Sequence, residues 1–280
     1  ALDTFATTSN GHDKLIDIDE KKLPKYVDRD EYQKYGFYES KPNKGDMYAP
    51  NQYIFEKDGR ISNFVMEPLY HIKGTNDPKK LFKIVNKYGE SAVIEMDMDA
   101  MNSLPRFRKI IEGAGNNLFE GKDTHLLHLK RKWYDKTLYC KRIENLGWQP
   151  EGFWAWANGI TTPNEEFIPV DENGIVSYAN EHYFIPALSI IYSDQTSIFK
   201  SERRFIYVKG SISFHEWAKH FIGIYGEQSK ISIAFYLTAL FSDYIFDRLD
   251  NLPILNFYGK KGTGKNAQAM SLMALFGKMQ

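Results

Sequence analysis

A glycine-rich stretch near the end of the sequence, residues 259–265, constrains the fold more than any other feature. It fits the pattern G-x-x-x-x-G-K without a gap, between an apolar run and an apolar helical stretch. Glycines permit backbone angles that turn successive amides toward phosphate oxygens, and a following helix adds unpaired amides and the positive end of its dipole. The pattern predicts a strand over 253–258, a phosphate-binding loop and a helix over about 266–276. The alternative is a glycine-rich turn whose lysines only keep it soluble.

The predicted nucleotide-binding residues form one continuous segment. They are Gly259, Lys260, Lys261, Gly262, Thr263, Gly264, Lys265 and Asn266. Lys265 is expected to reach the β- and γ-phosphates, and Thr263 to shape the loop. Asn266 occupies the position where a serine or threonine hydroxyl normally binds Mg²⁺. Its amide oxygen is a neutral donor that could bind the metal directly or through water, so Asn266 is the predicted metal ligand.

Hydrolysis of a nucleotide needs groups that do not follow this loop. An acidic residue on a later strand usually holds Mg²⁺ and the attacking water, and a trans-acting arginine usually assists. The sequence stops too soon for either, so we expect no catalytic residue here and inefficient ATP hydrolysis by this chain alone. Because the sequence does not begin with Met, we expect an internal fragment.

Composition excludes several classes of protein. The 36 basic and 36 acidic residues cancel, so only local patches can argue for a nucleic-acid partner. The single cysteine, Cys140, cannot form an internal disulfide, which favours a reducing, cytoplasmic location. The sequence has no apolar run long enough to cross a membrane and no secretion signal at its start. We therefore expect no membrane partner.

The hydrophobic patterns divide the chain into three parts. Residues 1–48 are polar without a sustained period and predict a linker or flexible arm. Residues 49–212 predict a β-rich domain: two hairpins, helices over about 103–115 and 124–136, then short strands separated by turn residues. Residues 213–280 predict two helices and the start of a P-loop ATPase domain. Ser213 and Glu216 form a capping box for the first helix, Gly226 ends it, and the second, over 229–249, is apolar enough to be largely buried. The predicted fold class is therefore α+β with the start of an α/β P-loop domain.

Several stretches together resemble a known family. They are "RISNFVMEPLYHI", "LFKIVNKYGESAVIEMD", "RIENLGW" and the late loop "GKKGTGKNAQAMSLMALFG". The sequence resembles the domain-of-unknown-function 927 helicases, and the loop is similar to that of superfamily 3 and D5-like primase-helicases of phages and mobile elements. The resemblance covers about residues 52–277. Some relatives of this kind carry a residue other than Ser or Thr after the loop lysine, as Asn266 does here.

The resemblance implies an ATP-dependent DNA helicase that acts in the replication of a phage or mobile element. Such a protein assembles as a ring, with a hexamer expected, moves along single-stranded DNA and is often fused to a primase. Its implied cofactors are ATP and Mg²⁺, and its implied location is the cytoplasm, that of a bacterial host if a phage encodes it. Residues 1–48 would be the tether to the primase.

A local excess of cations predicts where single-stranded DNA binds. Residues 101–136 contain eight Lys or Arg against four Asp or Glu, with Trp133 and Tyr134 beside them. Cations that follow a phosphate backbone, next to rings on which bases stack, suit single-strand binding. The predicted contact residues are Arg106, Arg108, Lys109, Lys130, Arg131, Lys132 and Trp133. The alternative, which the pattern favours, is a solvated helix face with two aromatic residues in the core.

Other candidate sites have simpler explanations. Trp154 and Trp156 share one face of a predicted strand, which favours core packing over base stacking. His125 and His128 are three residues apart, but no further ligand completes a metal site. Asp97 and Asp99 are better explained as a strand end than as a paired-carboxylate site. Arg203 and Arg204 suit either a basic contact or a last strand.

Three functions remain open from the sequence. The leading one is a piece of an ATP-dependent DNA helicase. The second is a non-catalytic module that binds nucleic acid or protein and carries a vestigial phosphate loop. The third is a P-loop NTPase unrelated to DNA, against which the large β-rich domain argues.

Overall fold

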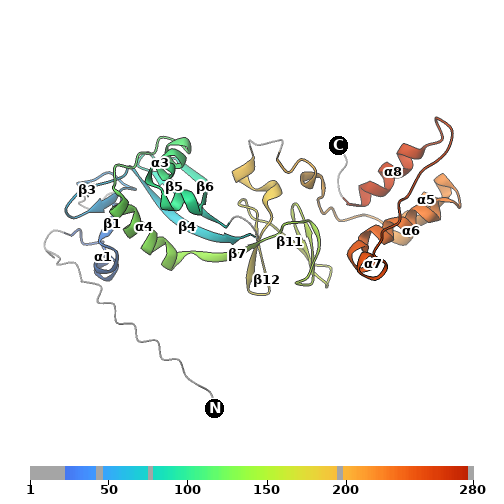
Figure 1. Cartoon of the computed structure of the whole chain (residues 1–280), viewed down its shortest axis with the longest axis horizontal. Coiled ribbons are helices and arrows are strands. Elements are labelled where there is room, and N and C mark those ends of the chain that lie inside the picture. Colours follow the sequence, from blue (N-terminus) through green and yellow to red (C-terminus); the bar gives the residue numbers. More distant parts are fainter. Residues whose placement is uncertain (1–22, 42–46, 75–77, 194–197, 277–280) are drawn as a thin grey trace, which may run out of the picture. The chain divides into compact units, whose positions relative to one another are not determined.

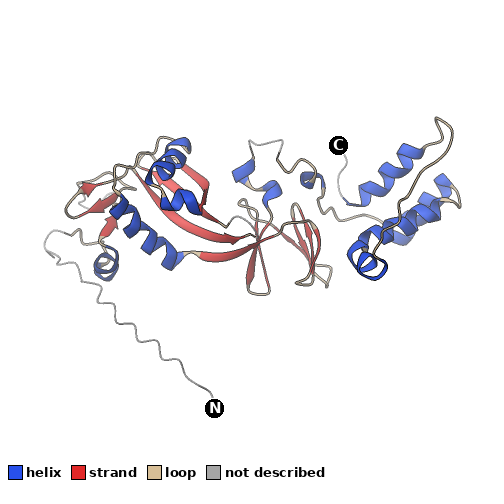
Figure 2. Ribbon diagram, in the orientation of Figure 1, coloured by secondary structure: helices blue, strands red, loops and turns tan. Residues whose placement is uncertain are grey.

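The computed structural model describes residues 23–41, 47–74, 78–193 and 198–276. The chain forms two compact units, Ala1–Arg142 and Ile143–Gln280, and each is described by itself (Figure 1). The division lies within the predicted β-rich domain, residues 49–212, and coincides with neither of its predicted boundaries. Both units contain helices and strands, so the chain is a mixed α and β protein whose strands lie in its first two thirds (Figure 2).

A sheet with β4 at its centre organises the first unit. β4 (Phe64–Lys73) pairs antiparallel with β5 (Lys79–Asn86) and parallel with β7 (Leu138–Arg142), and β5 pairs antiparallel with β6 (Ser91–Asp97). The turn between β5 and β6 is closed by the Asn86 side chain, whose oxygen accepts hydrogen bonds from the amides of Tyr88 and Glu90. The predicted hairpin over these two strands is confirmed.

Helices cover one face of this sheet (Figure 1). They are α2 (Met98–Asn102), α3 (Leu104–Gly113) and α4 (Asp123–Lys136). Pro105 lies in the first turn of α3, where its missing amide costs nothing, and Ser103 is the N-cap, although its side chain makes no capping hydrogen bond. Asp97, at the end of β6, caps α2. Both predicted helices and the interpretation of Asp97 as a strand end are confirmed.

The predicted flexible arm is wrong for residues 28–40. Asp28 caps α1 (Arg29–Tyr35), and β1 (Phe37–Glu39) pairs with β2 (Tyr53–Phe55), which pairs with β3 (Gly59–Arg60). Tyr35 and Phe37 are buried in the core of the unit. Single aromatic residues, each packed against a distant element, hold this segment in place, and they leave no periodic pattern in the sequence. Residues 1–22 and 42–46 of the arm lie outside the described residues.

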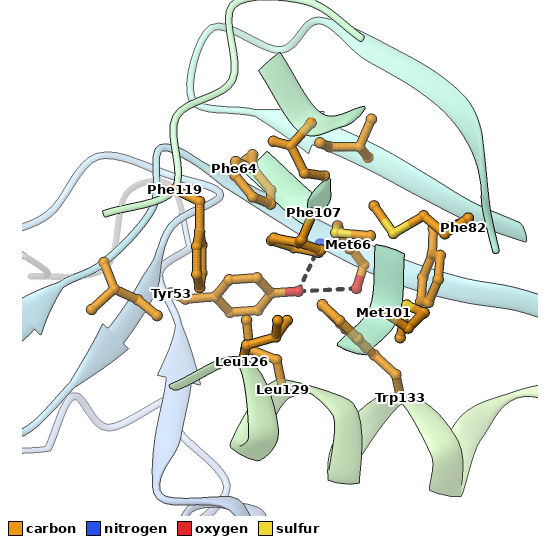
Figure 3. Packing of buried hydrophobic residues seen from close by; sticks show 14 of the residues in the cluster. Tyr53, Phe64, Met66, Phe82, Met101, Phe107, Phe119, Leu126, Leu129 and Trp133 are labelled. Atoms are coloured by element: carbon orange, nitrogen blue, oxygen red, sulfur yellow. Dashed lines mark hydrogen bonds between the residues drawn. The ribbon is translucent and has the colours of Figure 1, made fainter. Parts of the chain in front are cut away.

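The core of the first unit is built around the Tyr53 side chain. Phe64 and Met66 from β4, Phe82 from β5, Phe107 from α3 and Leu126, Leu129 and Trp133 from α4 surround it (Figure 3). The Tyr53 hydroxyl donates to the carbonyl oxygen of Met66 (3.1 Å) and accepts from the Met66 amide (2.7 Å). Burial raises the pKa of Tyr53 well above its ordinary value. One side chain thus satisfies both backbone groups of a residue on β4.

The second unit begins with a small antiparallel sheet and a hairpin. The sheet has the order β11-β10-β9-β8, and β12 pairs with β13. The bounds are β8 (Gly147–Gln149), β9 (Phe153–Trp156), β10 (Gly159–Thr161), β11 (Phe167–Pro169), β12 (Ile175–Tyr178) and β13 (Glu181–Phe184). The 3₁₀ helices η1 (Pro186–Leu188), η2 (Ile190–Tyr192) and η3 (Glu202–Arg204) follow. Arg203 and Arg204 therefore lie in a 3₁₀ helix and not in a strand.

The tryptophans of the small sheet, Trp148, Trp154 and Trp156, are not among its buried core residues. Phe153 and Ala155 are fully buried and form the inner face of β9, so Trp154 and Trp156 share the opposite face. Trp148 lies directly across from Trp154 on β8 and is 57% exposed. The shared face was predicted correctly. The predicted packing holds in part, because both residues are half-buried and Trp156 packs against Phe205 (5.0 Å between ring centroids) and Tyr207 (5.8 Å), although neither tryptophan is among the buried core residues. Alternation fixes which residues share a face and leaves open which face is covered.

Helices dominate the rest of the second unit. They are α5 (Phe214–Tyr225), α6 (Ser229–Leu240), α7 (Ser242–Leu249), α8 (Lys265–Met273) and the 3₁₀ helix η4 (Ala274–Phe276). The capping box of Ser213 and Glu216 is present, and Gly226 ends α5 with a φ of 81°, as predicted. The predicted second helix is divided at Phe241. It is also not largely buried: Ile231 is 66% exposed and Phe246 55% exposed. Among the described residues, only a small cluster around Phe221, Ile233 and Leu272 packs against α6.

No helix in the described part of the chain is both long and apolar enough to cross a lipid bilayer.

Replacement of Tyr53 by phenylalanine is expected to destabilise the first unit by about 2 kcal/mol, because the buried amide and carbonyl of Met66 lose their partner. Urea unfolding, followed by far-ultraviolet circular dichroism, measures the change. Tyr88→Phe is the matched control, since Tyr88 is 65% exposed, and we expect it to stay within about 0.5 kcal/mol of the unchanged protein. Equal effects of the two substitutions would refute the role of the Tyr53 hydroxyl.

Candidate functional site

The glycine-rich segment follows a stretch without regular secondary structure. No strand is formed over the predicted range 253–258, and Ile254 and Tyr258 in it are 93% and 99% exposed. The predicted strand is therefore wrong for this structure. A strand needs a neighbour to accept and donate its backbone hydrogen bonds, and among the described residues no strand lies beside this one.

The segment itself adopts a closed loop that ends in a helix. Gly262 and Gly264 have left-handed φ angles of 86° and 78°, which glycine alone adopts without strain. Gly264 is the N-cap of α8, so the predicted helix is confirmed and begins at Lys265. Thr263 donates its hydroxyl to the carbonyl oxygen of Lys260 (2.9 Å), a bond across the loop that agrees with its predicted shaping role.

The Lys265 side chain turns back over the loop that precedes it. Its ammonium donates to the carbonyl oxygens of Gly259 (2.8 Å) and Lys260 (2.7 Å). The ammonium is thereby held beside Gly259 and Lys260, at the start of the loop. Lys260, Lys261 and Asn266 are exposed around it.

The helix that follows the loop is anchored on α5 and α6. The Gln268 side chain donates to the Ser232 hydroxyl of α6 (2.9 Å), and the hydroxyls of Ser271 and Tyr225 are 3.3 Å apart. Leu272 is buried against Phe221 and Ile233. These contacts fix the helix whose first turn carries Asn266, so the unpaired amides at its start have a defined direction.

Metal ligands are sparse around the loop. Among the described residues, no group of three or more His, Cys, Asp or Glu side chains could hold a metal ion. Asn266 supplies one neutral oxygen from an exposed position in the first turn of α8. A divalent ion here would therefore take most of its ligands from phosphate oxygens and water, which Mg²⁺ tolerates well.

No family model, curated protein or solved structure matches this chain.

The predicted DNA-contact residues on α3 are partly committed to other contacts. Arg106 forms ion pairs with Asp97 (3.4 Å) and Asp99 (2.7 Å). Arg108 donates to the carbonyl oxygens of Phe119 (3.1 Å) and Gly121 (2.8 Å), which fastens the loop after α3. Lys109 is exposed, and the structure gives it no partner among the described residues.

The predicted residues on α4 divide in the same way. Lys130 donates to the Asn102 side chain (2.7 Å), and Arg131 is exposed. The Lys132 side chain is 12% exposed and pairs with Glu39 (3.0 Å) and Glu31 (3.2 Å). Burial opposes the charged form of Lys132, but the two carboxylates hold its pKa above the ordinary value. The structure thus gives Lys132 the role of joining α4 to α1 and β1.

Trp133 cannot stack on a base in this structure. The residue is 1% exposed, and its ring packs against Phe82 (5.0 Å between centroids) and Phe107 (6.2 Å). Its prediction as a nucleic-acid contact is wrong, because i, i+3 spacing on α4 places it with Leu126 and Leu129 in the core. The favoured alternative, an aromatic core residue, holds for Trp133, whereas Tyr134 is 43% exposed.

The two histidines of α4 serve the fold. The His125 ring bonds to Asp58 (3.2 Å) and accepts from the Lys122 amide (3.1 Å), and the His128 ring bonds to the carbonyl of Tyr35 (2.6 Å). Each has its own partners, so they do not share a metal.

Sequence analysis missed one cationic residue, Lys80 on β5. It is 7% exposed and lies on the same side of the strand as the core residues Phe82 and Ile84. The signal was present in the sequence, because positions 80, 82 and 84 alternate with period two and the first of them is charged. A lysine that faces the core is costly unless its ammonium has a hydrogen-bond acceptor or a counter-charge.

Replacement of Lys132 by methionine is expected to destabilise the first unit by about 2 kcal/mol, because Glu39 loses its cation and Glu31 keeps only Lys136. Thermal or urea unfolding measures the loss. Contact with Lys136, and next with Lys132, keeps the pKa of Glu31 below its ordinary 4.5. The stability that the ionised Glu31 contributes is therefore fully present above pH 4.5 and is lost as the pH falls through the lowered pKa.

The matched control is Lys109→Met, which removes one exposed charge and is expected to change stability by less than about 0.5 kcal/mol. If both substitutions leave stability unchanged, Lys132 is free for another role and the assignment fails.

Proposed function

We propose that residues 259–266 bind the phosphate groups of a nucleoside triphosphate, with ATP as the expected ligand. The observation that carries the proposal is the position of the Lys265 ammonium, 2.8 Å and 2.7 Å from the carbonyl oxygens at the start of the loop. A loop that folds back on its own lysine holds a full positive charge at its start, beside two backbone carbonyl oxygens. That combination favours a compact polyanion over a neutral ligand.

The glycines and the anchored helix support the same assignment. Left-handed angles at Gly262 and Gly264 are of the kind that lets successive amides turn toward a phosphate, and side chains at these positions would strain the backbone. The contacts of Gln268 and Leu272 hold α8, so its dipole points at the loop with little freedom. In this proposal Lys265 neutralises phosphate charge, the amides orient the phosphates, and Asn266 offers an oxygen to Mg²⁺.

We further propose that the loop belongs to an ATP-dependent DNA helicase of the superfamily 3-like kind, with a P-loop ATPase domain, a primase partner and a ring-shaped assembly. This part rests on the motif resemblance together with the helical pair α5 and α6 that carries α8. Mg²⁺-bound nucleotide supplies the energy for movement in such proteins, and the residues described here would bind and orient it. A vestigial loop in a non-catalytic binding module is the competing function, and the exposed stretch 253–258 is the feature that favours it.

Replacement of Lys265 by alanine is expected to weaken nucleotide binding at least about 30-fold, because the charge inside the loop is lost, which corresponds to about 2 kcal/mol. Titration of the 280-residue chain with a fluorescent ATP analogue in the presence of Mg²⁺ measures the affinity.

Lys261→Ala is the control, because in this proposal residue 261 contributes its backbone amide, which alanine keeps, and its side chain is exposed; we expect less than about a threefold change. Equal losses from the two variants, or no binding by the unchanged chain, would remove the nucleotide site. The helicase assignment has a separate test, which is ATP-dependent strand displacement by the protein of the complete open reading frame with and without Lys265→Ala.

Replacement of Asn266 by threonine tests the metal assignment. A hydroxyl is the better-suited ligand at this position, so we expect affinity in the presence of Mg²⁺ to rise about threefold and affinity in the presence of a chelator to stay the same. The same titration, run with Mg²⁺ or with EDTA, separates the two cases. An equal change under both conditions would mean that residue 266 acts on the loop and not on the metal.

A further inference from the structure

Lys80 carries a buried charge without a counter-ion. The residue is 7% exposed, on the face of β5 that the helices cover. Its ammonium lies 4.5 Å from the centre of the Tyr134 ring on α4. Within the described ranges, no carboxylate or other acceptor pairs with it. Burial lowers the pKa of Lys80, as expected for an ammonium removed from water and held only by a ring face.

The residues beside Lys80 add positive charge and further polar atoms without partners. His71 on β4 stands opposite Lys80 in the antiparallel ladder and opposite Tyr139 in the parallel one, so the three side chains form a row across the sheet. The Nδ1 atom of His71 is buried and has no hydrogen-bond partner. Burial lowers the pKa of His71, and the charges of Lys80 and then Lys73 lower it further. We call Lys73, His71, Lys80, Tyr134 and Tyr139 the Lys80 cluster.

A β-bulge creates this row. The pairing of β4 with β5 shifts by one residue between Pro68 and Tyr70, because proline has no amide to donate to the ladder. Without the shift, Tyr70 would stand opposite Lys80 and His71 would point to the other face of the sheet. The bulge therefore places an imidazole beside a buried ammonium, an arrangement that costs stability.

Nearby carboxylates are already in use. Asp135, next to Tyr134 on α4, is bonded to Lys34 (2.7 Å) and to the Tyr35 hydroxyl (2.8 Å). Glu95 pairs with Lys79, which alternation places on the other face of β5. Within the described part of the chain, no carboxylate thus neutralises Lys80, in contrast to Arg106 and Lys132, whose charges are paired within the fold.

The rings of the cluster are open to solvent. Tyr139 is 64% exposed, lies edge-on to His71 at 5.6 Å and has the Lys73 ammonium 4.2 Å from its ring centre. Tyr134 is 43% exposed on α4, which runs beside the sheet (Figure 1). Cations and exposed rings in one row match the two parts of a nucleic-acid strand, which are charged phosphates and flat bases.

We propose that the Lys80 cluster binds the phosphodiester backbone of a single nucleic-acid strand, with the rings of Tyr139 and Tyr134 as stacking surfaces for its bases. A bound phosphate supplies the counter-charge that Lys80 lacks, and Lys73 lies at the exposed end of the row. A free phosphate would leave both rings unused, so a strand explains more of the cluster. The site contains no residue of the nucleotide loop and does not depend on the function proposed for it.

The test is the affinity of the 280-residue chain for a fluorescein-labelled 15-nucleotide oligo-dT, measured by anisotropy at several NaCl concentrations. Lys80→Met is expected to weaken binding about tenfold at low salt and to reduce the salt slope by about 0.7, the value for one lost contact to a single strand. Lys83→Met removes the same charge from the same strand but from its exposed, opposite side, and we expect less than a twofold change. Tyr139→Leu is expected to weaken binding about tenfold with the salt slope unchanged, because stacking involves no counter-ion.

Folding and ligand class need their own controls. Lys80→Met removes an unpaired buried charge, so its thermal midpoint is expected to equal or exceed that of the unchanged chain. If that variant unfolds, Lys73→Met takes its place, since Lys73 is exposed. Lys265→Ala is expected to leave oligonucleotide binding intact, which separates this site from the nucleotide loop. Equal binding by Lys80→Met and Lys83→Met overturns the proposal. So does displacement of the oligonucleotide by millimolar phosphate at constant ionic strength, which would identify a site for isolated phosphate.

Discussion

The pairing of β4 with β5 is the interaction on which the first unit depends, because it assigns every side chain of the sheet to a face. Before the bulge at Pro68, the ladder directs Met66 and Phe82 toward the helices, where Tyr53 and Trp133 complete the core. After the bulge, the same face carries His71 and Lys80. A single residue without an amide thus changes the helix-covered face from apolar to cationic along one strand. Core and candidate binding surface are consecutive stretches of one ladder.

Local signals in the sequence predicted much of the fold. The β5–β6 hairpin, the helices α3 and α4 and the capping box at Ser213 all follow from patterns within about 20 residues, and the structure contains each of them. The elements that were missed depend on distant partners. Tyr35 and Phe37 are ordered by contacts with residues far along the chain, and the stretch 253–258 lacks the neighbouring strand that its apolar residues would need. Apolar character alone also did not reveal that much of α6 and α7 is exposed.

The candidate sites differ in how much of them a sequence can reveal. The loop at 259–266 is contiguous, so its glycines, its lysine and its unusual Asn266 were all visible as a motif, and the structure adds the bonds from Lys265 to Gly259 and Lys260. The basic region at 101–136 was visible only as composition. Composition counts charges but does not show their partners, and ion pairs formed across 7 to 105 residues of sequence decide which charges remain.

The partners of a charged side chain show whether the fold neutralises its charge, which the number of charges in a stretch of sequence does not. For this reason Lys80, which was not predicted, says more about a ligand than the lysines that were. Lys132 is buried but has two carboxylates, so its burial is accounted for by the fold and gives no argument for a ligand. Lys80 is buried as deeply, but among the described residues its ammonium interacts with the Tyr134 ring alone, and an imidazole stands opposite it. Natural folds rarely keep an uncompensated buried charge, because desolvation makes it costly. Where such a charge persists beside exposed aromatic rings, the simplest physical explanation is an external anion that supplies the missing charge. This explanation does not depend on how many lysines lie near Lys80 in the sequence.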